Sequence, residues 1–369
     1  MAWNACRPYA IALAIFASSR LVVFLAVSFA LVYVRRNYPE LPDVGTSWYH
    51  ALLRWDAGWY VNIVDKGYAD EINSAAFYPL YPLLAKGLTL LGVPTAHALL
   101  IVTNTAAIVA AVLLFKLARE QFDDNVAYFS VAAFGFFPTS LFLSAGYSES
   151  LALAFILGCF LLLRRQYLVA AAICAGLALA TRSTGIVLVP VILWEVWKTH
   201  RGEPGRLVKY AVTSTVLATL GLTLFMAYLW FAFDDPLRFA AVQTHWHSGT
   251  SFGERLLSAL TLKPLMYRAS EGAIYFAGCL ILLLVFWRRI GTSQAIYGIG
   301  VLILPYLTLA GGPSRFGSMP RFALLAFPVF IVIGHLCKDR SWLAVILAAL
   351  GTAGLFATTA AFSQWHWSG

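Results

Sequence analysis

Residues 341–361 read SWLAVILAALGTAGLFATTAA, a run without a charged side chain that is long enough to cross a bilayer as a helix. Comparable apolar runs recur along the 369-residue chain, which is 60% hydrophobic and only 12% charged, with a mean hydropathy of +0.76. A soluble domain carries about 25% charged residues, so about half of the usual charge is missing. Inside lipid only helices and closed barrels satisfy the backbone, and these runs are too long for barrel strands of about ten residues. The sequence therefore predicts an all-α polytopic membrane protein.

Hydropathy predicts about eleven transmembrane helices. They span residues 8–34, 94–117, 125–144, 149–163, 167–181, 183–197, 210–232, 272–287, 292–310, 321–336 and 341–361. We expect them to form one integral membrane domain over residues 1–369, interrupted by two long polar segments at 35–93 and 233–271.

The formal net charge of +9 is concentrated in short clusters at the ends of apolar runs, among them Arg164-Arg165, Arg288-Arg289 and Lys338–Arg340. Cytoplasmic loops are enriched in Lys and Arg, so the N-terminus is expected inside and both polar segments, 35–93 and 233–271, outside. This placement differs from a basic groove, and no nucleic-acid partner is expected. We expect a protein of the plasma (inner) membrane, in contact with membrane lipids, whose site faces the periplasmic or extracellular side.

The first outer segment contains an aromatic pattern with helical spacing. Large apolar side chains recur every three or four residues at Trp48, Leu52, Trp55, Trp59 and Ile63. This spacing predicts one amphipathic helix over 48–63, lying on the outer membrane surface. Its neighbouring row contains a carboxylate at position 56, partly withdrawn from water, which is costly unless the protein uses it. The alternative is a helix anchor whose carboxylate pairs with the arginine at position 54 or faces water.

Residues 77–82 read FYPLYP and follow the same outer segment. Prolines at 79 and 82 should prevent an ordinary helix from starting before Pro82. We expect this run, with Tyr78 and Tyr81, to shape a rigid wall or the entrance of a lipid-facing groove.

Three arginines are candidates for holding a phosphate, because the guanidinium is planar and permanently charged. Arg182 follows the span 167–181 beside a helix start, and Arg321 flanks the last short outer turn. Arg20 lies inside the first span, where a cation is a functional candidate. Arg20 could instead snorkel or pair with a neighbouring helix.

Two further clusters contain candidate substrate-binding residues. In the tetrapeptide 147–150, YSES, Ser148 could cap the next span and Glu149 could interact with its dipole, so a structural role and a site role are both open. His245 and His247 are two residues apart and do not share a helix face. The five cysteines form no CxxC pair, so neither a disulfide framework nor a zinc site is expected. No cofactor is expected; metal dependence stays open, with independence favoured.

These motifs together resemble the signature of bacterial members of the PIG-V mannosyltransferase family. The resemblance rests on RWDAGWY at 54–60, Gly67-Tyr68, FYPLYP at 77–82, YSES at 147–150 and ATRS at 180–183. It is good over residues 20–190 and loose over the C-terminal half. The chain departs from the family pattern at Thr184, where members often carry Asn, and around His245, which is only loosely similar to a His-Tyr-Trp-Asn stretch of the eukaryotic enzymes.

The resemblance implies a GT-C type glycosyltransferase that uses a polyprenyl-phosphate sugar, usually mannose, at the outer face. It assigns the catalytic base to Asp56, which would deprotonate an acceptor hydroxyl during an inverting displacement. Arginines would stabilise the departing phosphate. The acceptor, which could be a lipid, a glycan or a protein, is not specified. The other residues expected at the substrate are Arg54, Trp55, Trp59, Tyr60, Glu149 and His245.

Two other functions remain compatible with the sequence. A secondary transporter would also use many spans and an intramembrane arginine, but it should have paired broken helices and carboxylates at the midplane of the membrane. Here the carboxylates gather in the outer segments. A non-catalytic subunit related to the enzymes would differ from them in one testable way, because Asp56 would be dispensable.

Overall fold

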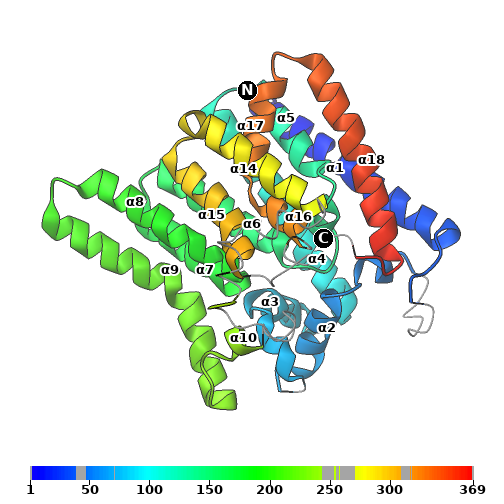
Figure 1. The fold of residues 1–369 in the computed structure, drawn as a ribbon, viewed down its shortest axis with the longest axis horizontal. Helices are drawn as coiled ribbons and strands as arrows, with labels where there is room; N and C mark the ends of the chain where they lie inside the picture. The colour runs from blue at the N-terminus through cyan, green and yellow to red at the C-terminus, as the bar shows by residue number, and fades with distance from the viewer. Residues whose placement is uncertain are drawn as a thin grey trace. The chain divides into compact units, whose positions relative to one another are not determined.

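The computed structural model describes residues 2–38, 47–69, 71–242, 253–254, 257, 271–308, 316 and 318–367. The described residues form helices and turns without a strand, which confirms the all-α prediction (Figure 1). Most of the second outer segment, including His245, lies outside the described residues. The chain divides into two compact units, each of which is described by itself. Unit 1 comprises Met1–Asp65, Leu84–Ala154 and Val329–Gly369, and unit 2 comprises Lys66–Leu83 and Phe155–Pro328.

Unit 1 is built around α1, which packs against α4, α5 and α18. These helices span Ala2–Tyr33, Thr95–Gln121, Asp124–Gly135 and Ser341–Ser363. The shorter elements η1, α2 and η3 span His50–Leu52, Ala57–Lys66 and Ser140–Leu143. Small residues allow close approach between spans, as membrane helices require. At Gly334, for example, a Cβ atom would overlap the Ser130 side chain of α5.

Unit 2 contains the adjacent helices α7, α8 and α9 and a second group formed by α14, α15 and α16 (Figure 1). They span Leu168–Thr181, Leu188–His200, Pro204–Phe233, Glu271–Ile290, Thr292–Thr308 and Met319–Leu325; η2, η4 and α10 span Ile72–Ala76, Ser183–Val187 and Arg238–Ala241. The α7–α9 contact depends on facing glycines, because a Cβ on Gly221 would overlap the carbonyl of Gly176. Three helices pass between the units in sequence, and these are α3 (Leu80–Thr89), α6 (Glu149–Arg164) and α17 (Pro328–Cys337).

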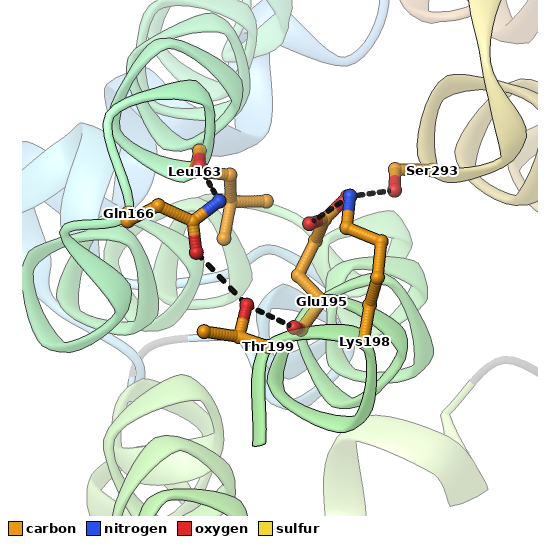
Figure 2. Close-up of polar contacts among 6 residues, drawn as sticks. All are labelled: Leu163, Gln166, Glu195, Lys198, Thr199 and Ser293. Atoms are coloured by element: carbon orange, nitrogen blue, oxygen red, sulfur yellow. Dashed lines mark hydrogen bonds and ion pairs between the residues drawn. The ribbon is translucent and has the colours of Figure 1, made fainter. Parts of the chain in front are cut away.

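A carboxylate network joins α8 to α15 within unit 2 (Figure 2). The buried Glu195 accepts a short hydrogen bond from Ser293 Oγ on one carboxylate oxygen and pairs with Lys198 Nζ at 2.6 Å through the other. Thr199 Oγ1 donates to the carbonyl of Glu195 at 2.8 Å, and it also lies 2.8 Å from Gln166 Oε1. Both carboxylate oxygens therefore have protein partners, as a buried charge requires.

Five helices are long and apolar enough to cross a membrane, or six if one bent pair counts as a single span, among the described residues. They are α1 from Cys6, α4, α9, α14 from Gly272 and α18, and the bent pair is α16 with α17. A multi-pass membrane protein is thus confirmed, whereas eleven spans are not.

Several predicted helices differ in extent from the observed ones. The span expected at 125–144 ends at Gly135, ahead of Pro138, and continues as η3. The span expected at 321–336 is broken before Pro328. The helix that was not expected before Pro82 begins at Leu80, because a proline in the first turn costs no intrahelical hydrogen bond.

Candidate active site

The loop that contains Asp56 does not form the single helix predicted over 48–63. Helix η1 ends at Leu52 and α2 begins at Ala57, and between them Trp55 adopts a left-handed backbone conformation with φ of 55°. For a residue other than glycine this conformation costs about 1–2 kcal/mol. The break separates the predicted aromatic stripe into two parts and places Asp56 immediately before the first turn of α2.

A buried tyrosine fixes the backbone on both sides of this break. The hydroxyl of Tyr147 accepts a hydrogen bond from the backbone N–H of Asp56 and donates one to the carbonyl of Arg54, both at 3.1 Å. Tyr147 is itself held, because its carbonyl accepts from Thr103 Oγ1 at 3.0 Å. The strained turn at Trp55 is therefore held by contacts from distant parts of the chain.

The segment around Tyr147 makes further contacts with the Asp56 loop. The backbone N–H of Gly146 donates to the carbonyl of Leu52 at 3.0 Å, and Tyr60 Oη lies 2.9 Å from Ser148 Oγ. A Cβ on Gly146 would overlap Leu53, so this close approach requires glycine. The YSES and RWDAGWY motifs thus meet in unit 1.

Arg54 and His50 are two ionisable residues that precede Asp56 in the same segment. Arg54 is buried; its guanidinium carbon lies 4.9 Å from the ring centroid of Trp365, and its Nε donates to the carbonyl of Ser363 at 3.4 Å, at the end of α18. The Tyr49 ring contacts both His50 and His97, with centroid separations of 4.3 and 4.7 Å. Burial, followed by repulsion from Arg54 and His97, lowers the pKa of His50.

Arg20 occupies a different part of unit 1, at the end of α5. It donates to the carbonyls of Gly135 and Ser140 at 2.7 and 2.6 Å, and also to the hydroxyls of Ser19, Ser140 and Ser144. Carbonyls at a helix end lack intrahelical partners, and a cation is favourable there. These contacts favour the helix-pairing alternative for Arg20.

Arg182 and Arg321 both lie within unit 2, and each contacts the ring of Phe322. Arg182 lies at the junction of α7 and η4, and the buried Arg321 lies in α16. Their guanidinium carbons are 5.9 and 6.0 Å from the ring centroid of Phe322. Both side chains are permanently charged, and a guanidinium is chemically suited to a phosphate.

The aromatic–proline run also belongs to unit 2. Tyr78 is buried against Phe225 and Phe239, with ring centroids 5.5 and 6.0 Å apart, and this burial raises the pKa of its phenol. Tyr68 donates to the carbonyl of Phe77 at 2.7 Å. Tyr81 is completely buried, which is typical of a packing residue.

The sequence of this chain matches a known protein family. Residues 27–233, more than half of the chain, match the sequence model of a family described as mannosyltransferase (PIG-V). The chain belongs to the mannosyltransferase (PIG-V) family. The Asp56 loop, the YSES motif and Arg182 lie within the matched residues, whereas Arg321 lies beyond them.

Curated relatives of this mannosyltransferase-family chain agree with the match. GPI mannosyltransferase 2 of Drosophila pseudoobscura pseudoobscura is 32% identical over 124 residues, which cover 31% of this chain and 27% of that protein. GPI mannosyltransferase 2 of Schizosaccharomyces pombe is 29% identical over 168 residues, covering 42% and 35%. The matched regions therefore span about a third of these relatives or less.

The fold of this chain is similar to that of solved structures. ArnT from Cupriavidus metallidurans, bound to undecaprenyl phosphate, aligns with a TM-score of 0.54 at 18% identity, covering 94% of this chain and 64% of that one. The Archaeoglobus fulgidus oligosaccharyltransferase aligns with a TM-score of 0.53 at 13% identity, covering 97% and 56%. The expected GT-C type fold is confirmed.

The candidate residues of this PIG-V member fall into two groups. Unit 1 contains Asp56, Arg54, Trp55, Trp59, Tyr60, Glu149 and Arg20, whereas unit 2 contains Arg182, Arg321, Tyr78 and Tyr81. Glu149 is completely buried at the start of α6. No cluster of three or more His, Cys, Asp or Glu suited to a metal ion occurs within the described part of the chain.

Sequence reasoning missed the hydroxyl of Tyr147 as the group that holds the Asp56 loop. It also missed the contact of Trp365 with Arg54 and Trp55. Tyr147 could have been singled out because it begins a motif that the family shares, but a motif does not say which backbone groups its side chain contacts. Trp365 offers no such signal.

Proposed function

We propose that this chain transfers a sugar, in the first instance mannose, from a polyprenyl-phosphate donor to a hydroxyl acceptor. The observation that carries the proposal is the geometry of Asp56, a carboxylate of the family signature at a strained turn fixed by Tyr147. Membership of a mannosyltransferase family supports the sugar, and likeness to a protein bound to undecaprenyl phosphate supports the lipid carrier.

The proposed reaction is one displacement with inversion at the anomeric carbon. The acceptor oxygen forms a bond to that carbon while Asp56 takes the hydroxyl proton. The bond between the anomeric carbon and the phosphate oxygen breaks, and its electron pair leaves with the polyprenyl phosphate. A single base is sufficient, in contrast to the two carboxylates of a retaining hydrolase.

The leaving phosphate gains charge, and we assign its stabilisation to Arg182 and Arg321 around Phe322. Arg20 is placed third, because its donors are directed to carbonyl and hydroxyl groups of its own unit. Its proposed role is to position the end of α5. These assignments rest on charge and chemistry, and donor kinetics can test each arginine separately.

The proposed site faces the periplasm or the cell exterior of a plasma (inner) membrane protein. The support is the unequal distribution of basic residues along the sequence. Clusters such as Arg164-Arg165 and Arg288-Arg289 lie in short loops that are expected to be cytoplasmic, and the long polar segments are then expected on the opposite side of the membrane. The test labels a cysteine introduced at Trp48, which is 51% exposed, in a variant whose five native cysteines are replaced by serine or alanine. Reaction with a membrane-impermeant maleimide in intact cells would establish the side.

The test is transfer of labelled mannose from polyprenyl-phosphate mannose by the purified Asp56→Asn protein. Asparagine keeps the size of the side chain but removes the base, so turnover should fall by about 10³-fold or more. Asp65→Asn is the matched control, because Asp65 is an exposed carboxylate on the same helix α2 that accepts from Thr95 at 2.5 Å. Full transfer by folded Asp56→Asn would show that Asp56 is not the base, whereas no transfer by the unaltered, folded protein would favour a non-catalytic subunit or a transporter.

A further inference from the structure

Three helix junctions of unit 2 carry an excess of positive charge. They lie at 164–167, 195–209 and 288–293, on the side of the membrane that is proposed to face the cytoplasm. Together they contain eight Lys and Arg residues and only two carboxylates. Those carboxylates pair with Lys198 and Arg206, at 2.6 and 2.8 Å. The six other cations are all exposed, and we call them the basic patch: Arg164, Arg165, Arg201, Lys209, Arg288 and Arg289.

Hydrogen bonds between side chains hold the three junctions together (Figure 2). Gln166, which follows Arg165, has its Oε1 atom 2.8 Å from Thr199 Oγ1 at the end of α8. Ser293, just after the basic end of α14, donates to the carboxylate of Glu195, which lies one helical turn before Thr199. The basic patch is therefore a fixed feature of unit 2, assembled from distant parts of the sequence.

Exposed aromatic side chains accompany the basic patch. Trp197 is 43% exposed and Trp287 is 45% exposed. The guanidinium carbons of Arg201 and Arg288 lie 5.8 Å from the ring centroids of these two tryptophans, respectively. Tyr167, in the first junction, is 61% exposed. Because Trp and Tyr side chains prefer the headgroup region of a bilayer, cations held over such rings lie at the depth of the lipid phosphates.

The corresponding junctions of unit 1 have nearly balanced charges. Their cations are Arg7, Lys116, Arg119, Lys338 and Arg340, and their carboxylates are Glu120, Asp123, Asp124 and Asp339. Arg119 pairs with Asp124 at 2.5 Å, and Lys338 lies 3.8 Å from Asp123. Membrane orientation depends on the placement of Lys and Arg and is nearly indifferent to carboxylates. Orientation therefore explains the cations of both units, but not the scarcity of carboxylates in unit 2.

We propose that the basic patch binds anionic phospholipid headgroups of the membrane leaflet that adjoins it. A lipid phosphate is a good acceptor for the planar guanidinium fork, and basic pockets between membrane helices bind anionic headgroups. In phosphatidylcholine the choline cation cancels the phosphate charge, so the patch should prefer phosphatidylglycerol. The proposed donor site is separate, since Arg182 lies at the opposite end of the 14-residue helix α7 from Gln166.

The experiment measures lipid binding to the purified, delipidated full chain. Dioleoyl phosphatidylglycerol and dioleoyl phosphatidylcholine are added in equal amounts in a nonionic detergent, and native mass spectrometry counts the bound lipids. The unaltered chain should bind phosphatidylglycerol about tenfold more tightly, because each basic side chain near an anionic headgroup contributes about fivefold. Arg201→Gln with Arg288→Gln should bind both lipids about equally. Replacing the same two residues by lysine should preserve the preference.

Arg7→Gln with Arg340→Gln is the matched control, because it removes two cations from the junctions of unit 1. This variant and Arg182→Gln should both keep the preference for phosphatidylglycerol. An equal loss in the unit 1 control would mean that net charge alone attracts the lipid, and a loss in Arg182→Gln would assign the lipid to the donor site. Either result would overturn the inference, as would an unaltered chain that binds both lipids equally.

Salt provides a test that needs no substitution and holds even if the glutamine variant does not fold. The preference of the unaltered chain for phosphatidylglycerol should disappear as sodium chloride rises from about 0.05 to about 0.5 M, because exposed charges are then screened. A preference that stays constant over this range would contradict binding through the basic patch.

Discussion

Two carboxylates of this protein, Glu195 and Asp56, occupy contrasting surroundings. Glu195 lies inside a regular helix, and both of its oxygens meet protein partners, Ser293 and Lys198. Asp56 lies at a helix start, beside a tryptophan with a left-handed backbone, and Tyr147 fixes the main chain around it. The first arrangement neutralises a charge to join two helices. The second holds strain to place a carboxylate, which is the pattern of a reactive site.

After Asp56→Asn, the largest loss of turnover is expected from changes at Arg182 and Arg321. These two residues extend the comparison of structural and reactive groups to unit 2. Arg182→Lys and Arg321→Lys keep the charge but lose the planar fork, so turnover with the polyprenyl-phosphate donor should fall by about 10²-fold. Arg238→Lys is the control, because Arg238 also lies over a ring, Phe233, at 4.5 Å. Equal turnover in all three variants would show that the pair does not act on the phosphate.

A smaller effect should follow when the support of the loop is removed. Tyr147→Phe deletes the hydroxyl that bonds to Asp56 and Arg54, so the carboxylate loses its fixed position and turnover should fall about tenfold. The thermal midpoint should fall only a few degrees, because about 1 kcal/mol of hydrogen bonding is lost. Tyr68→Phe removes a comparable buried hydroxyl, bonded to the carbonyl of Phe77, and should leave turnover unchanged.

Glu195→Gln should lower stability and leave turnover unchanged, whereas the changes at the Asp56 loop lower turnover and leave stability nearly unchanged. The amide cannot pair with Lys198 as a charge, so unfolding should become easier by about 1–3 kcal/mol. Turnover per folded molecule should stay within twofold of the wild type. The measurement is the thermal midpoint in detergent together with donor turnover, and a selective loss of turnover would erase the distinction between the two carboxylates.

The smallest expected effect concerns the stability of the folded protein at acidic pH. The folded protein lowers the pKa of His50, so the unfolded chain binds more protons, and the contribution of the neutral imidazole to stability is present above the ordinary pKa of about 6.5. That contribution is lost as pH falls through the folded pKa. His50→Gln should therefore flatten the fall of the thermal midpoint below about pH 6.5. An unchanged slope would mean that His50 does not couple to folding.

The fold class followed from the sequence because long apolar runs have few stable solutions in lipid. Pattern reasoning failed at Trp55, where helical spacing continues through a turn that the distant Tyr147 holds open. It failed again before Pro82, since position within a first turn decides whether proline breaks a helix.

The candidate site was predictable only in part. The motifs named Asp56 and Arg182, and their proposed roles remain to be tested. No local pattern could pair Arg182 with Arg321 around Phe322, or place Trp365 against Trp55, because helix packing sets those contacts across long stretches of chain.

The most direct test measures Asp56→Asn and Glu195→Gln side by side for mannose transfer and thermal midpoint. We expect Asp56→Asn to keep its midpoint within about two degrees and lose turnover by about 10³-fold, and Glu195→Gln to lose several degrees and keep turnover. If Asp56→Asn transfers mannose at the wild-type rate while folded, Asp56 is not the base and the account of this loop is wrong.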